Sequence, residues 1–168
     1  IYKRDHDKLS STEFTFSRFL VPYLQEYNGW ALFCDSDFIF VEGIEHLFSI
    51  AENKYAVMCV QHDYNPDDQK KKLGSSQLLY PRKNWSSLVL WNCSHPSNKI
   101  VNPELVNTQT GKYLHRFGWL KDEEIGKINH EWNWLVGWYE EPKDGKPKGI
   151  HFTEGGPWLG DDFKDVKY

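Results

Sequence analysis

The chain has 168 residues, 26% of them charged, and a formal net charge of −4. This length suffices for one domain with a buried core, so we expect a single domain over residues 1–168. The slightly acidic balance argues against a nucleic-acid-binding surface, which is normally basic, and no apolar run reaches the length of a membrane span. No secretory signal is visible, and we therefore expect a cytoplasmic protein.

Two compositional features bear on the core. The three cysteines, Cys34, Cys59 and Cys93, have no regular spacing, which argues against a disulfide framework. Cys34 and Cys59 lie within apolar runs, so we interpret them as small core residues. Aromatic residues reach 16%, including eight Trp; they stack on sugars but also fill cores, so they carry little weight alone.

The first predicted elements are a loop and a short helix. Residues 1–11 are polar and charged, which is typical of a loop or a frayed end. Ser11 or Thr12 can cap a helix whose apolar residues follow a roughly helical period as far as Leu24. Because Pro22 lies within this run, we expect an early end or a kink.

Short apolar runs then alternate with helical patterns. Buried strands are predicted over residues 30–34, 55–60, 87–91 and 150–152, the first of them suited to a parallel sheet, and apolar character resumes over residues 38–41. Helices are predicted over residues 44–53, 103–117 and 122–128. Polar, turn-rich loops are predicted over residues 62–84 and 140–149. This alternation favours an α/β fold.

The first candidate site is Asp35-Ser36-Asp37, directly after a predicted strand. Carboxylates at the carboxyl end of a strand face the crevice where α/β sheets bind ligands. Mg²⁺ and Mn²⁺ take oxygen ligands and bridge to substrate phosphates, and a cation would relieve the repulsion within the pair. The alternative is a polar turn between two strands.

Two further segments supply candidate partners. His151 ends the last predicted strand and can supply an imidazole ligand, while Gly155 and Gly156 would let backbone N–H groups approach a phosphate. The alternative is a structural His held by its own turn. Arg18 lies on the helix before the Asp-x-Asp strand, where it needs an anionic partner such as phosphate or Asp35, unless it is an ordinary surface Arg.

Together these segments resemble the family eight retaining glycosyltransferases, which include glycogenin and bacterial lipopolysaccharide galactosyltransferases. Residues 17–24 and 30–37 look like the family's helix and Asp-x-Asp strand. The remaining similarities are to its Asn-Ser-Gly strand, its Asp-Gln-Asp segment, the Trp-Asn after that, and its terminal His-x-x-Gly-x-x-Lys-Pro-Trp, at residues 86–92, 122–125, 132–133 and 151–158. The resemblance covers residues 12–160.

The resemblance implies a GT-A fold, a Rossmann-type mixed sheet flanked by helices, whose first strands would precede Ile1. It implies Mn²⁺ or Mg²⁺ held by Asp35, Asp37 and His151 against a nucleoside diphosphate. The implied donor is a nucleoside-diphosphate sugar, a UDP-sugar above all. The acceptor, a glycan, protein or lipid, is not indicated, and retention of anomeric configuration is implied by the family alone.

The resemblance also implies donor contacts. Arg18, together with Asp35 and the two glycines after His151, would bind the donor's sugar or phosphates. Asp122 or Glu123 would lie near the sugar and stabilise oxocarbenium-like charge in the transition state. The Lys that precedes Pro-Trp in the family is Gly156 here, so we expect any replacement to come from other cations. The candidates are Arg82, Lys83 and Lys148.

Transfer of a sugar from a nucleotide-sugar is the favoured function, and two alternatives stay open. A metal-dependent phosphoryl-transfer or hydrolytic enzyme would need another acidic ligand near Asp37, for which Glu42 and Asp63 are the nearby candidates. A non-catalytic binding module on a decayed transferase scaffold is favoured by the absent N-terminal strands and the absent Lys. The intact Asp35, Asp37 and His151 argue against that module.

Overall fold

The computed structural model describes residues 2–4, 15–62, 82, 85–139, 146–153, 155–156 and 158. Its strands are β1 (Trp30–Cys34), β2 (Phe38–Phe40), β3 (Val57–Val60), β4 (Leu88–Asn92), β5 (Ile125–Ile128), β6 (Trp134–Leu135) and β7 (Gly149–His151). Its α-helices are α1 (Val21–Leu24), α2 (Glu45–Ser49), α4 (Pro103–Thr108) and α5 (Gly111–His115). Its 3-10 helices are η1 (Ser17–Leu20), η2 (Trp85–Ser87), η3 (Pro96–Ile100), η4 (Asp122–Glu124) and η5 (His130–Asn133).

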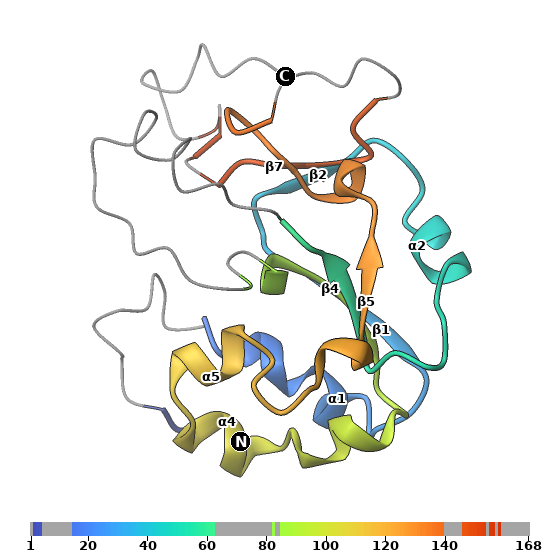
Figure 1. The fold of residues 1–168 in the computed structure, drawn as a ribbon. Coiled ribbons are helices and arrows are strands. Elements are labelled where there is room, and N and C mark those ends of the chain that lie inside the picture. Colours follow the sequence, from blue (N-terminus) through green and yellow to red (C-terminus); the bar gives the residue numbers. More distant parts are fainter. Residues whose placement is uncertain are drawn as a thin grey trace.

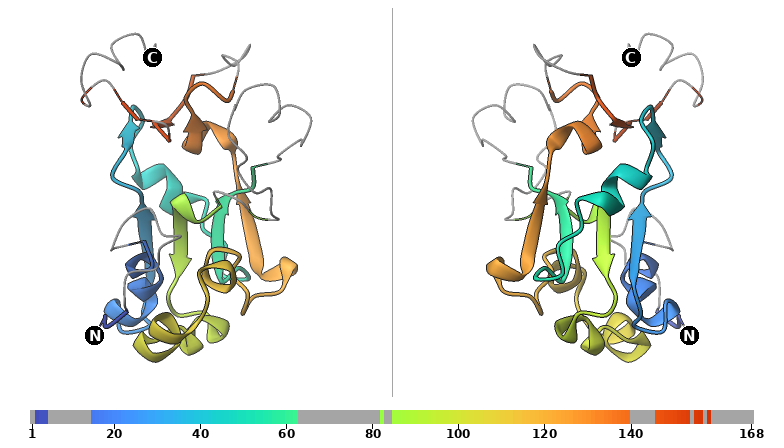
Figure 2. Two further views of the ribbon diagram at one scale, coloured as in Figure 1. Left: turned by 90° about the vertical axis from the view of Figure 1, so that its left-hand side faces the viewer. Right: turned by 90° about the vertical axis from the view of Figure 1, so that its right-hand side faces the viewer.

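Two mixed sheets organise the molecule (Figure 1). The larger has the order β1-β4-β3-β5, in which β4 is antiparallel to β1 and β3, and β3 is parallel to β5. β1, β3 and β5 therefore run in the same direction, and their carboxyl ends meet at one edge. The smaller sheet, β2-β7-β6, lies beyond that edge, and α1, α4 and α5 gather at the opposite end (Figures 1 and 2).

The large sheet separates two hydrophobic clusters. Successive residues of a strand point to opposite faces, so Val89 and Trp91 of β4 face one cluster while Leu88 and Leu90 face the other. The first cluster includes apolar residues of η1, α4 and α5, and the second includes Leu47 of α2. Both faces of β3 and β4 are thus covered, as predicted for these buried strands.

β1 differs from its prediction. It pairs antiparallel with β4, its five residues are all half-buried, and it lies at one end of the described sheet. Cys59 and Cys93 are buried, whereas Cys34 at the end of β1 is half-buried, and all three are free thiols. The core interpretation is confirmed for Cys59 and holds only in part for Cys34.

The helix predicted over residues 122–128 is wrong. Only η4 is helical, and the chain continues as β5, parallel to β3. Ile125 and Ile128 have helical spacing, but in the strand they enter opposite clusters. A Cβ at Gly126 would lie 2.5 Å from the Tyr55 ring and 2.7 Å from Met58, so the absence of a side chain lets β5 approach its neighbour closely.

The other predicted helices are shorter than expected. The predicted helix over 103–117 is two helices, because the Thr110 side chain accepts the N–H of Tyr113 and starts α5 anew. Pro22 lies in the first turn of α1, where its missing N–H is tolerated, so it produces no kink. The proposed caps Ser11 and Thr12 lie outside the described residues. No helix of the described part is long and apolar enough to cross a membrane.

Candidate functional site

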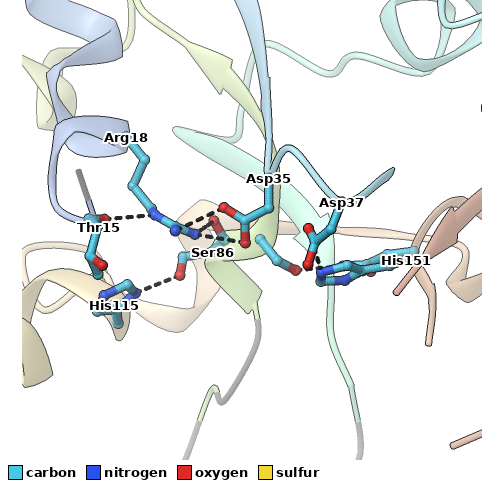
Figure 3. Close-up of polar contacts among 9 residues, drawn as sticks. Thr15, Arg18, Asp35, Asp37, Ser86, His115 and His151 are labelled. Carbon is cyan, nitrogen blue, oxygen red and sulfur yellow. Dashed lines mark hydrogen bonds and ion pairs between the residues drawn. The ribbon is translucent and has the colours of Figure 1, made fainter. Parts of the chain in front are cut away.

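Three side chains of types that can ligate a metal meet where the two sheets join (Figure 3). Asp35 follows β1 and Asp37 precedes β2, while His151 ends β7, which pairs antiparallel with β2 so that Phe38 lies opposite His151. The N–H of Phe152 donates to the Asp37 carbonyl at 3.0 Å. One ligand atom each from Asp35, Asp37 and His151 lies within 4.8 Å of the other two. The structure therefore brings together the three predicted ligands.

The donor set fits a divalent cation. Two carboxylates and an imidazole are ligands that Mn²⁺ accepts, and ligand atoms around one such ion lie roughly 3–4 Å apart. Oδ1 of Asp37 is shielded from solvent, and no described residue donates it a hydrogen bond of normal geometry. Nε2 of His151 lies 3.3 Å from this oxygen. A cation at this point would satisfy the shielded oxygen after a small inward movement of the ligands.

Arg18 binds the Asp35 carboxylate on the side that faces away from Asp37 (Figure 3). Its Nη2 lies 2.8 Å from Oδ1 of Asp35, and its Nη1 donates to Oδ2 at 3.2 Å. Nη1 also donates to the Ser86 carbonyl at 2.9 Å, and Nε to the Thr15 carbonyl at 2.8 Å. The predicted anionic partner of Arg18 is thus Asp35, and the guanidinium is anchored at three points by a geometry that only Arg provides.

The two carboxylates have opposite electrostatic environments. Burial raises the pKa of the Asp35 carboxyl, and the Arg18 guanidinium offsets only part of that effect. Burial also acts on Asp37, but His151 and Arg18 outweigh it and lower the pKa of Asp37 below its usual value. Charge at Asp35 is therefore the more costly of the two, and it is the charge that a cation bound here would stabilise most.

Ser86, whose carbonyl accepts from Arg18, also contacts His115 through its hydroxyl. Oγ of Ser86 lies 2.7 Å from Nδ1 of His115, whose ring meets Phe19 edge-on at 5.2 Å. Burial, with the nearby positive charges of Arg18 and Arg4, lowers the pKa of His115 to about 4. His115 therefore stays neutral at physiological pH. No sequence pattern predicts this pair, because it depends on the contact between α5 and η2.

Asp122 and Glu123 do not join the cluster. They lie in η4, which precedes β5, whereas Asp35 follows β1. Since β1 and β5 run in the same direction, η4 is at the opposite end of the sheet from the candidate metal ligands (Figure 1). Asp122 is 91% exposed and pairs with Arg82. The expected role of Asp122 or Glu123 near the donor sugar stays a prediction.

The remaining candidates are placed as follows. The N–H of Gly155 donates to the Phe152 carbonyl at 3.0 Å, and Gly156 packs so closely under Trp158 that a Cβ there would lie 2.2 Å from its ring. Lys148 pairs with Glu131 at 3.2 Å. Glu42 is not part of the described cluster. Asp63 and Lys83 lie outside the described residues.

Replacing Arg18 by Lys should destabilise the fold. An ammonium group cannot reproduce the four directional contacts to three residues, so we expect the free energy of unfolding to fall by about 1–3 kcal/mol in urea titrations. The control is Lys54→Ala, which removes an exposed pair with Glu52 and should keep near-wild-type stability. Wild-type stability of Arg18→Lys would show that the anchoring is unimportant.

His115 should make stability depend on pH. An unfolded His titrates near 6.5, and the folded pKa is about 4, so the unfolded chain binds more protons between these values. Stability should therefore fall as the pH drops through this window, by roughly 2–3 kcal/mol from His115. His115→Gln should flatten this slope in urea titrations. Part of the slope should remain, because burial also lowers the pKa of His62, to about 3.

The control for that experiment is His46→Gln, on the exposed surface of α2, which should keep the wild-type slope. An unchanged slope in His115→Gln would contradict the placement of a neutral, half-buried imidazole beside Ser86.

Comparisons with known proteins agree with the observed fold. No protein-family model matches the chain. The chain is similar to Protein CDI of Arabidopsis thaliana, with 53% identity over 171 residues that include the whole chain and 66% of the relative. The chain thus spans about two thirds of that relative's length.

Solved glycosyltransferases share the architecture. The structure resembles GlyE of Streptococcus pneumoniae TIGR4, with a TM-score of 0.59 and 14% identity over 89% of this chain and 39% of GlyE. It also resembles the bifunctional glycosyltransferase WbbM, with a TM-score of 0.57 and 16% identity over 88% of this chain and 33% of WbbM. The chain therefore has a GT-A-like glycosyltransferase fold, a mixed α/β structure in which helices flank mixed sheets.

Proposed function

We propose that this chain carries the metal-binding corner of a glycosyltransferase that transfers a sugar from a nucleoside-diphosphate sugar, above all a UDP-sugar, to an acceptor. The observation that carries the proposal is the cluster of Asp35, Asp37 and His151 at the carboxyl end of β1, within a fold shared with glycosyltransferases. The family eight resemblance of the sequence supports the donor class and retention of anomeric configuration.

Asp35, Asp37 and His151 would hold Mn²⁺ or Mg²⁺ at this point. The ion would supply positive charge to the diphosphate, which becomes more negative as the glycosidic bond breaks. The chain's own contribution is to fix the ligands. Asp37 and His151 are held by the pairing of β2 with β7, and Asp35 is held by Arg18. Little reorganisation is then needed when the donor binds.

Arg18 has limited capacity left for the donor. Its described contacts use the Nε hydrogen, both Nη1 hydrogens and one Nη2 hydrogen. One Nη2 hydrogen is left to reach a donor oxygen. We therefore assign Arg18 first to holding Asp35 and second to a single contact with the donor. Gly155 has already used its N–H within its turn, so the proposed backbone contact to phosphate falls to Gly156.

The phosphoryl-transfer alternative gains no support from the geometry. It needs a further carboxylate beside Asp37, and Glu42 does not join the cluster in the described part of the chain. The carboxylate pair and imidazole can hold one cation and would leave coordination positions open for phosphate oxygens, which suits charge neutralisation of a leaving diphosphate. Sugar transfer therefore explains the described side chains with fewer additional groups.

Asp37→Ala tests the proposal directly. Calorimetric titration of the full-length protein with a panel of UDP-sugars should show binding that requires Mn²⁺. The variant should weaken this binding by about 10–100-fold or more, because a ligand of the cation is removed. Glu52→Ala, an exposed carboxylate on the surface pair with Lys54, is the matched control and should bind like the wild type.

Two results would overturn parts of the proposal. If the full-length wild-type protein binds no UDP-sugar in the presence of Mn²⁺, the donor assignment is wrong. If binding persists unchanged in Asp37→Ala, the metal site is wrong.

A further inference from the structure

Asn133 lies behind the candidate metal site, entirely shielded from solvent. Its side chain bridges two other buried residues: Nδ2 donates to Oγ of Ser87 at 2.8 Å, and Oδ1 lies 2.9 Å from Nδ1 of His151. These residues come from three separate elements, η2, η5 and β7. A buried amide placed between them joins the large sheet to the strand that carries the candidate ligand.

The amide oxygen determines which nitrogen of His151 carries the proton. A carbonyl oxygen can only accept, so Nδ1 of His151 must be the donor. Nε2 is then the ring nitrogen left for a cation, and this atom is the one that lies 3.3 Å from Oδ1 of Asp37. The hydrogen bond to Asn133 thus prepares Nε2 as a metal ligand.

The strand pairing and ring stacking of His151 do not determine which way its imidazole is turned about the Cβ–Cγ bond. The pairing of β7 with β2 and β6 fixes its backbone, and the Phe38 ring stacks on it with centroids 4.2 Å apart. Stacking is nearly indifferent to a half-turn of the imidazole about its Cβ–Cγ bond, a rotation that would exchange a nitrogen for a carbon at the metal position. Only a directional bond to a ring nitrogen distinguishes the two orientations.

We propose that Asn133 is a positioning residue that holds His151 with Nδ1 protonated and Nε2 directed at a divalent cation, with Ser87 orienting the amide. The inference rests on the metal site proposed above and extends it to a second layer of residues. Partners of this kind typically contribute 10–100-fold to metal affinity.

The experiment measures the Mn²⁺ affinity of the full-length protein by electron paramagnetic resonance of free Mn²⁺. Asn133→Leu removes the acceptor at similar volume and should weaken binding by about 10–100-fold. Asn133→Asp keeps an acceptor for His151 but loses the donor to Ser87, and should stay within about threefold of the wild type. Asn98→Leu, which removes another fully buried Asn at the opposite end of the sheet, should lose stability but keep Mn²⁺ affinity.

Each outcome decides the question. Wild-type affinity in Asn133→Leu contradicts the inference, and so does an Asn133→Asp variant as weak as Asn133→Leu, because the amide would then donate to His151. If Asn133→Leu does not fold, a loss of about tenfold or more in Asn133→Asp still contradicts the inference, and an affinity within about threefold of the wild type agrees with it. Loss of binding in Asp37→Ala with full binding in Asn133→Leu would overturn this inference but not the proposed function. A wild type that binds no Mn²⁺ overturns both.

Discussion

The pairing of β2 with β7 is the constraint on which the candidate site depends. It places His151 opposite Phe38, although more than a hundred residues separate them, and it is reinforced by the stacking of the two rings and by the bond from Phe152 to the Asp37 carbonyl. Without this pairing, Asp37 would lie on an open turn. The small sheet therefore serves to bring an imidazole to the carboxyl end of β1.

The two acidic residues of the candidate site, Asp35 and Asp37, have different charged partners. Removal of a carboxylate from water is costly unless it gains a partner, and Asp35 obtains one in Arg18 while Asp37 obtains one in His151. Burial still raises the pKa of Asp35, so the pair is not fully compensated by the described residues. Behind both carboxylates lie neutral polar side chains, His115 with Ser86 and Asn133 with Ser87, which orient the charged groups without adding charge.

The sequence predicted those parts of the fold and site that depend on local pattern. Continuous apolar runs predict β3 and β4, and the Asp-x-Asp turn and His151 are candidate ligands from the sequence alone. It failed where a tertiary contact overrode the pattern: β5 has helical spacing but is a strand because Gly126 lets it pack against β3. The sequence alone assigns no role to Asn133, because the role of a buried Asn depends on the residues that other elements place around it.

The central claim is that Asp35, Asp37 and His151 hold one divalent cation beside a diphosphate. Diffraction from crystals of the full-length protein grown with Mn²⁺ and UDP, recorded at the manganese absorption edge, tests it most directly. We expect one anomalous peak roughly 2 Å from a carboxylate oxygen of Asp37 and from Nε2 of His151, next to the UDP phosphates. Ordered UDP with no manganese among these three side chains would contradict it.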